Sequence, residues 1–595
     1  MAFQLSPGVN YSEIDLTTVI PAVSTTAGAF AGQFDWGPAN QRVLVTNEVD
    51  LVNKFGKPNS NTAVSFFTAA NFLAYGNNLQ VVRAANTNTF NAFASTNPSL
   101  PNTANNIIIN NKDNYQRSYI SDSNNITYVA RYPGTLGNSL KVSICDSNVN
   151  TANANSIGFT SWEYKSYFPA APNTTPFVAA TGGANDQFHL VVVDEDGLFS
   201  NGVKGTVLEV FPFLSKAIDC VGDDGTGKYY RTVIENQSQY IYMLGAPDRA
   251  NTANANAAGR WGISTTALAN ISFCGIGNTT FQTVSLSNST SNTVTLAEIS
   301  TGYSYFNNKD EVDISLILTG DGGMGANSSI DANTVVVQQT VIDLAATRKD
   351  CVAFVSAPYG IIANTTPTSV VSGWVSTLGR ASNYAVADCG WKYQFDKYNN
   401  VYRWIPLNGD IAGLCVRTDQ TNDPWFSPAG VNRGAIKNVV KLAWNPSQAQ
   451  RDSIYSIGVN PVISLPGQGT ILYGDKTFVT QPSAFDRINV RRLFLVLEKA
   501  ITTASKYSLF EMNDEFTRAQ FIALVEPYLR DIKGRRGIYD YRVVCDNTNN
   551  TPQVIDTNQF VGDIYIKPAR SINYIQLNFI AARTGVNFNE IVGAV

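Results

Sequence analysis

The sequence is poor in charge and in the residue types that most catalytic sites use. Charged residues make up 15% of the 595 residues, the formal net charge is −4, and His189 is the single histidine. So small a net charge gives no basic field for nucleic acid and only weak repulsion between copies. A catalytic triad or a histidine-based metal site needs partner residues that the chain does not group around His189. We therefore expect a structural histidine, no catalytic residue, no metal and no cofactor.

The chain also lacks long apolar runs and paired-cysteine motifs. No run of 18 apolar residues occurs, and the first residues have neither a basic nor an apolar signal region. These absences predict no membrane insertion and no secretion by a signal peptide. The cysteines are scattered without CxxC spacing, which predicts buried free thiols in a reducing cytoplasm. They are Cys145, Cys220, Cys274, Cys351, Cys389, Cys415 and Cys545.

The chain is long, its hydrophobic content is 44%, and many of its polar residues are the neutral Asn, Thr and Ser. That length exceeds what one hydrophobic core supports, so we expect a mixed α/β (α+β) multidomain protein. The predicted parts are an extended arm (1–22), a discontinuous α/β core (23–86 plus 345–485), a β-rich outward insertion (87–344) and a C-terminal domain (486–595) that ends in a strand arm (571–595).

Local patterns support these parts. Residues 66–73 carry a helical apolar stripe, and residues 79–83 have a strand-like composition. In the middle of the chain, apolar runs and alternation predict strands at 190–193, 206–211 and 229–243.

Three patterns that could indicate chemistry have simpler interpretations. Residues 222–228 match GxxxxGK, but Tyr229 stands where a P-loop needs Ser or Thr, and residues 229–234 read as a strand, so we expect a β-turn. The acidic run 194–196 precedes Gly197 and predicts a hairpin turn. Four tryptophans without clustered spacing predict core packing and not a carbohydrate platform; they are Trp391, Trp404, Trp425 and Trp444.

The block from 487 to 546 is the most informative. Apolar residues from Val490 to Ala504 recur at helical spacing, and a second helical face runs from Phe521 to Ile532, with Asn513 or Asp514 placed as its cap. Pro527 is expected to end or kink this second helix near Glu526. Gly534 is expected to stop it, and residues 538–544 alternate like a strand.

Both ends of the chain read as strands without an obvious partner in the same molecule. Val9 and Tyr11 share one face of the N-terminal arm, and Ile575, Leu577 and Phe579 alternate with polar residues near the C-terminus. Unpaired strands of this kind can link copies of a polymer. We take these residues as candidate inter-subunit contacts.

Several motifs occur in an order that resembles the tail sheath proteins of contractile-tailed bacteriophages. They are SPGVNYSEID (6–15), GAFAGQFDWGPAN (28–40), ARYPGTLGNSLKV (130–142), DIAGLCVRTDQTNDPWFSPAGVN (410–432), GVNPV (458–462), GQGTILYGDKT (467–477), and INVRRLF, FEMND, GRRGIYDY and RVVCD within 488–546. Ser427 departs from the family's pattern, in which alanine is commoner. The resemblance covers nearly the whole chain.

This resemblance implies a virion structural protein made in the host cytoplasm. Its copies are expected to form a helical homopolymer of sixfold rings around an inner tail tube, held by terminal arms that pair with neighbours. The expected partners are the tail tube protein, the baseplate and the tail terminator, with no nucleic acid and no membrane. Contraction from a metastable extended state would drive the tube through the host envelope. The C-terminal domain of the family faces the tube, which makes Lys533, Arg535 and Arg536, and more weakly Arg530, candidate tube contacts. Cations at a helix C-terminus also complement the macrodipole without any partner.

Other classes stay open. A related contractile injection system uses the same kind of sheath subunit, and a non-contractile virion protein would also have terminal arms. The Asn/Thr-rich middle would suit an adhesin or glycan binder. A hydrolase fits worst, since no nucleophile motif accompanies the single histidine.

Overall fold

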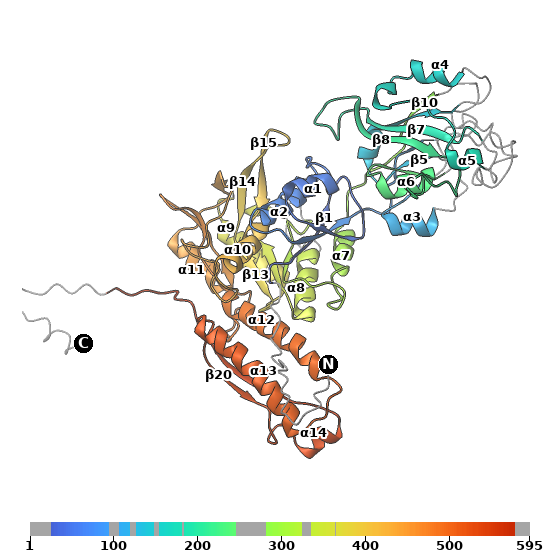
Figure 1. Cartoon of the computed structure of the whole chain (residues 1–595). Helices are drawn as coiled ribbons and strands as arrows, with labels where there is room; N and C mark the ends of the chain where they lie inside the picture. Colours follow the sequence, from blue (N-terminus) through green and yellow to red (C-terminus); the bar gives the residue numbers. More distant parts are fainter. Residues whose placement is uncertain are drawn as a thin grey trace, which may run out of the picture. The chain divides into compact units, whose positions relative to one another are not determined.

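The computed structural model describes residues 25–94, 106–119, 127–147, 154–180, 184–244, 281–323, 335–362 and 364–577. These residues form two compact units (Figure 1). One unit comprises the described residues up to 423 together with 428–491, and the other comprises 424–427 and 492–577.

The first unit is built on a seven-stranded sheet with the order β17-β13-β12-β11-β1-β3-β2. All neighbouring strands pair in parallel except β2 and β3, which are antiparallel. The strands are β1 (Gly28–Gln33), β2 (Arg42–Val45), β3 (Leu79–Ala84), β11 (Leu316–Leu318), β12 (Val352–Ser356), β13 (Ala385–Asp388) and β17 (Val459–Asn460). The central strands β1, β11, β12 and β13 are buried along almost their whole length, as parallel sheets covered by helices are.

Helices pack on this sheet in pairs. Helix α2 (Ala63–Leu73) lies against α10 (Asn408–Thr421), and α7 (Leu296–Ser304) lies against α8 (Val336–Arg348). The first pair approaches closely because α10 carries glycine: a Cβ on Gly409 would lie 2.5 Å from the backbone oxygen of Thr68. The remaining helices of this part are α1 (Glu48–Phe55), α9 (Pro367–Leu378) and α11 (Gln448–Ser456).

The core sheet draws on more of the chain than the sequence boundaries suggest. Strand β11 pairs with both β1 and β12, and α7 packs against β1 and β3, although β11 and α7 lie in the range 87–344 that we assigned to the insertion. Part of that range therefore completes the core before residue 345.

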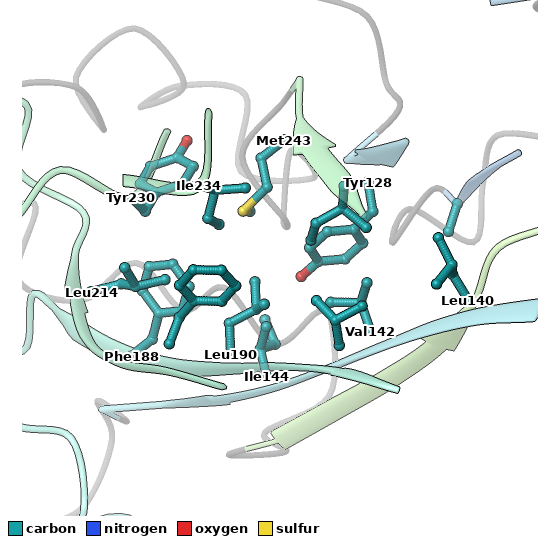
Figure 2. Packing of buried hydrophobic residues seen from close by; sticks show 14 of the residues in the cluster. Tyr128, Leu140, Val142, Ile144, Phe188, Leu190, Leu214, Tyr230, Ile234 and Met243 are labelled. Atoms are coloured by element: carbon teal, nitrogen blue, oxygen red, sulfur yellow. The ribbon is translucent and has the colours of Figure 1, made fainter. Parts of the chain in front are cut away.

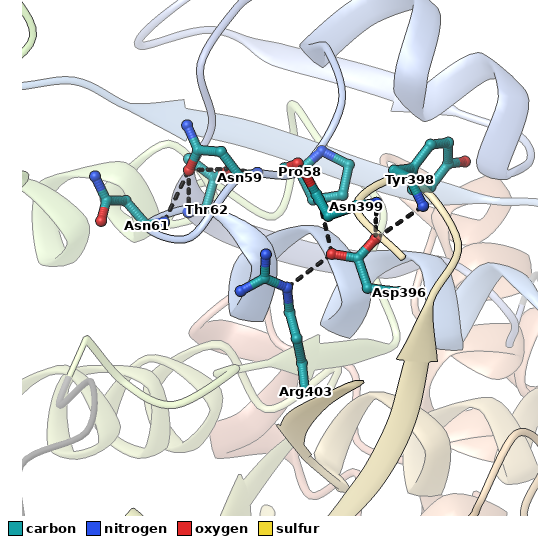
Figure 3. A network of polar contacts seen from close by, with 8 residues as sticks. All are labelled: Pro58, Asn59, Asn61, Thr62, Asp396, Tyr398, Asn399 and Arg403. Carbon is teal, nitrogen blue, oxygen red and sulfur yellow. Dashed lines mark hydrogen bonds and ion pairs between the residues drawn. The ribbon is translucent and has the colours of Figure 1, made fainter. Parts of the chain in front are cut away.

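Two smaller antiparallel sheets follow in the same unit. Strands β14 (Trp391–Asp396), β15 (Val401–Pro406) and β16 (Lys441–Leu442) form one sheet, and β18 (Val462–Leu465) and β19 (Gly469–Leu472) form the other. Asp396 anchors the β14–β15 turn, because its carboxylate accepts hydrogen bonds from the Tyr398 backbone N–H at 2.9 Å and from Arg403 Nε at 2.7 Å (Figure 3). Asn399 Nδ2 donates to the Pro58 carbonyl at 2.8 Å, which ties this turn to the segment before α2.

The insertion is β-rich, as expected. Its four-stranded sheet has the order β10 (Phe281–Ser285), β6 (Leu140–Asp146), β7 (Gln187–Asp194) and β8 (Thr206–Ser215). A three-stranded sheet has the order β4 (Phe93–Ala94), β5 (Tyr128–Ala130) and β9 (Ile241–Met243). Side chains of both sheets meet in one apolar core, which includes Leu190, Val142, Tyr128 and Met243 (Figure 2). The helices here are α3 (Lys112–Ser118), α4 (Ala154–Ser161), α5 (Pro176–Ala180) and α6 (Tyr230–Gln237).

The strand predicted at 229–243 is partly wrong. Residues 230–237 form helix α6, and only Ile241–Met243 are a strand. Tyr230 and Ile234, four residues apart, are the buried apolar residues of α6, a spacing that fits one helical face in so short a segment. The GxxxxGK run nevertheless forms the expected turn, with the Gly225 N–H donating to the Gly222 carbonyl at 2.9 Å.

The acidic run 194–196 begins the connection between β7 and β8, as a hairpin requires. Asp194 is buried, and its carboxylate accepts hydrogen bonds from the backbone N–H groups of Leu198, Phe199 and Ser200. This carboxylate therefore holds the loop in shape.

The second unit contains the two helices and the strand that the sequence block predicts, followed by a short helix and a second strand that were not predicted. They are α12 (Ile488–Ser505), α13 (Glu515–Gly534), β20 (Ile538–Val544), α14 (Pro552–Asp556) and β21 (Asp563–Pro568). Asp514 is the N-cap of α13 and accepts from the Thr517 N–H at 2.8 Å. The expected end near Glu526 is wrong, since α13 continues through Pro527 to Gly534. Pro527 and Ala523 are both exposed, so water can satisfy the carbonyl that proline leaves without a donor.

Candidate assembly surfaces

The basic corner at the end of α13 brings together the cations that the sequence singled out. Lys533 Nζ lies 3.0 Å from the Asp540 carboxylate, and Arg535 Nη1 lies 3.5 Å from that of Asp531. All these groups are about half exposed. The hydrogen bond from Lys533 lowers the pKa of the Asp540 carboxyl. These cations are partly compensated by carboxylates of the same unit.

The backbone at this corner places an arginine where glycine is usual. Arg536 has φ 66°, and the Gly537 N–H donates to the Ile532 carbonyl at 2.9 Å, which is the hydrogen-bond pattern of a Schellman helix end. The left-handed conformation costs an L-residue with a Cβ about 1–2 kcal/mol. Strain of this kind is common where a side chain has a task beyond stability. Arg536 is exposed.

Arg535 is held by an aromatic residue from elsewhere in the chain. Its guanidinium lies over the Trp425 ring, 5.1 Å from the centroid, and Trp425 Nε1–H donates to the Arg535 carbonyl at 3.1 Å. The spacing of the tryptophans predicts core packing for Trp425, and its contact with Arg535 was not predicted. No local pattern could reveal it, because the two residues are far apart in the chain.

The hairpin β20–β21 is the strand-pairing element of the second unit. Its strands are antiparallel, with Tyr541 opposite Ile566 and Val543 opposite Ile564, and they form a two-stranded sheet. The Tyr541 hydroxyl donates to the Glu526 carbonyl of α13 at 3.3 Å. Two-stranded sheets are marginal by themselves, so this hairpin relies on α13 and can gain stability from a further strand.

The C-terminal arm leaves this hairpin as an extended segment (Figure 1). The Ala569 N–H donates to the Gly537 carbonyl at 3.0 Å, and residues 569–577 have no helix or strand assignment. Ile575 and Leu577 are 78% and 71% exposed. Phe579, Val9 and Tyr11 lie outside the described residues.

His189 and the described cysteines lie buried within the fold. His189 is buried; its Nδ1 accepts from the Phe213 N–H at 3.1 Å, so its Nε2 carries the proton donated to the Ala170 carbonyl at 2.8 Å. Burial lowers the pKa of His189 to about 4. The cysteines within the described ranges are buried free thiols. Those ranges contain no cluster of potential metal ligands and no helix suited to crossing a bilayer.

An exposed apolar cluster that was not predicted occupies the connection from α12 to α13 and the first turn of α13. Tyr507, Leu509, Phe510, Met512 and Phe516 are all more than half exposed there. The density of large apolar residues within a turn was the available signal.

Comparisons with known proteins agree with this architecture. A family model of the phage tail sheath C-terminal domain matches residues 480–582, and one of the phage tail sheath protein central domain matches 323–478. A model of the tail sheath protein Gp18 domain III N-terminal region matches 25–84.

Whole-length relatives are similar as well. The chain is 36% identical to the tail sheath protein of Vibrio phage KVP40, over 99% of this chain and 100% of that one. It is 34% identical to the tail sheath protein of Enterobacteria phage T4, over 99% of each. A sheath tail protein from Listeria innocua shares the fold, with a TM-score of 0.51 and 11% identity over 92% of this chain and 96% of that one.

Proposed function

The chain belongs to the phage tail sheath protein family, a family of virion structural components, and on that premise we propose that its copies polymerise as stacked rings around an inner tube. The observation that carries the proposal is the identity of 36% along the full length of a tail sheath protein. We further propose sixfold rings, with the tail tube protein, the baseplate and the tail terminator as partners. No chemistry by the subunit itself is part of this function.

The terminal arms would join the rings. An arm from one copy can add a strand to the β20–β21 hairpin of a neighbour, since main-chain hydrogen bonds supply affinity and alternate side chains supply specificity. The exposure of Ile575 and Leu577 supports this proposal, because both have apolar area left to bury. Val9 and Tyr11 would act in the same way at the other end of the chain.

Shared strands explain how a sheath can contract without falling apart. Rigid units joined by extended arms can pivot while the hydrogen bonds between copies persist. A difference of about 1–3 kcal/mol per copy between an extended and a contracted lattice, within the range of ordinary interface changes, adds up over a long assembly. This metastable extended state would drive the tube through the host envelope without nucleotide hydrolysis.

The basic corner would face the tube. Lys533, Arg535 and Arg536 gather at one end of α13, and the conformation of Arg536 favours a functional reason for arginine at that position. Their charge would complement an acidic tube surface.

Electron microscopy of the purified full chain tests the function. We expect hollow, striated tubes by negative staining, with and without added tube protein. A chain truncated after Ala569 should fold as the full chain does but form no tubes. A full chain that remains monomeric at all concentrations, or normal tubes from the truncated chain, would contradict the proposal.

A further inference from the structure

The outward face of the β14–β15 hairpin carries an aromatic platform, made of Tyr393, Phe395, Tyr402 and Trp404. Tyr393 pairs with Trp404 across the strands and Phe395 with Tyr402, with ring centroids 4.7 and 5.2 Å apart. Phe395 and Tyr402 are 45% and 51% exposed. Lys441 of β16 lies over two of the rings, 5.0 Å from the Tyr393 centroid and 5.5 Å from that of Trp404.

The inward face of the same hairpin is polar, the reverse of an ordinary half-buried sheet. Lys392 forms a buried ion pair of 2.9 Å with Asp410, and Gln394 accepts from Asn71 Nδ2 at 2.9 Å. Asp396 is buried in the network of Figure 3. These contacts fix which face points inward, because a shift by one residue would break all of them. An exposed aromatic face held outward in this way indicates a binding surface.

A second exposed apolar surface, the apolar tip, lies in the other unit, at the connection from α12 to α13 and the first turn of α13. It consists of Tyr507, Leu509, Phe510, Met512 and Phe516, which are 76%, 62%, 104%, 78% and 69% exposed. Phe510 has φ 70°, a left-handed conformation that is unusual for a bulky residue. A fully exposed aromatic ring on a strained backbone gains nothing for the single chain, so it indicates a partner.

Both surfaces are apolar, and the charges that they carry are opposite in sign. The apolar tip carries exposed Glu511, Asp514 and Glu515 against one exposed Lys506. The platform carries Lys441, which is exposed and placed over its rings. Acidic groups around an apolar tip suit a cation at an aromatic surface, by both charge attraction and cation–π contact.

We propose that the apolar tip of one copy docks on the aromatic platform of a second copy. The contact rests on the proposed function, which brings copies together at high local concentration. It joins two different surfaces, so each copy offers one and accepts the other, and such contacts propagate into rings or helices. It adds a side-chain interface to the strand pairing of the arms.

Cross-linking between differently marked copies tests the contact. Full-length Tyr402→Cys and Phe510→Cys proteins are mixed under assembly conditions and treated with a short bismaleimide. Mass spectrometry should find peptides joined between positions 402 and 510, a link that only two separate copies can form. As a matched control, Tyr167→Cys replaces a tyrosine that is 53% exposed in the insertion and should give no link to position 510.

A charge exchange gives a second, independent readout. Glu511→Lys and Lys441→Glu should each raise the critical concentration for assembly about fivefold, as loss of an exposed charge pair predicts, and the double variant should recover most of this loss. Glu163→Lys, at an exposed position of the insertion, should change nothing.

The outcomes separate this contact from the function on which it rests. The contact is wrong if every variant forms tubes but no 402–510 link is found. It is also wrong if the platform binds a glycan or another protein and no such link forms. In both cases the proposed function stands. Absence of tubes from the unmodified chain would count against the proposed function itself.

Discussion

Replacing Ile575 and Leu577 with serine should separate folding of the subunit from its assembly. The two side chains are 78% and 71% exposed in the single chain, so their removal costs the fold almost nothing. Burial of an aliphatic side chain stabilises by about 1.5–3 kcal/mol, so loss of both should weaken the contact between copies by about 4 kcal/mol. That difference corresponds to an increase of about a thousandfold in the critical concentration for assembly.

Sedimentation across a concentration series, checked by negative staining, measures this shift. Chemical denaturation of the monomer should give the same midpoint for the variant and the unmodified chain. The matched control is Ile572→Ser with Tyr574→Ser, because these residues are equally exposed but lie on the other face of an extended strand. We expect the control to assemble better than the test variant. Equal assembly of the test variant and the unmodified chain would refute the reasoning, and a stronger effect of the control would show that the opposite face is the one buried.

Three further changes test the basic corner and two buried groups. Arg536→Gly should raise the free energy of unfolding by about 1 kcal/mol, because glycine relieves the left-handed backbone, yet weaken binding to tube protein. The control Lys349→Gly, at φ 63°, should stabilise the chain by a similar amount and leave tube binding unchanged. Equal tube binding by both variants would contradict a contact between the basic corner and the tube. Burial holds the pKa of His189 at about 4, below its ordinary value. The contribution of neutral His189 to stability is therefore present above about pH 6.5 and should fall by about 3 kcal/mol as the pH drops to about 4. In the His189→Gln variant, stability measured by denaturation should depend less on pH over this range. Burial raises the pKa of Asp388 to about 8, so the contribution of the protonated side chain to stability is greatest at low pH and is lost as the pH rises from about 4 to about 8. Asp388→Asn should therefore be more stable than the unmodified chain near pH 9. If the stability of the unmodified chain does not decline between about pH 4 and about pH 8, this assignment is contradicted.

Local periodicity predicted α12, α13 and β20 of the second unit because these elements are long or strongly patterned, whereas the short α14 and β21 were not predicted. The apolar spacing from Val490 to Ala504 became α12, and the alternation at 538–544 became β20. Short segments carry a weaker periodic signal. Residues 230–237 fit the helical and the strand period equally well. They form a helix, whose residues Tyr230 and Ile234 pack in the insertion core. Pro527 did not end α13, because the carbonyl it deprives of a donor is at the surface.

By itself, the sequence determined the kind of molecule: an assembly subunit with low charge, one histidine and family motifs along its length. Tertiary structure alone decided which residues meet. The pairing of β11 with β1, the stacking of Arg535 on Trp425 and the gathering of Tyr393 and Tyr402 on one outward face all join residues through the folded chain. The physical reason is that composition and period are local properties, whereas the burial of Lys392 and Gln394 beneath that face depends on partners from distant segments.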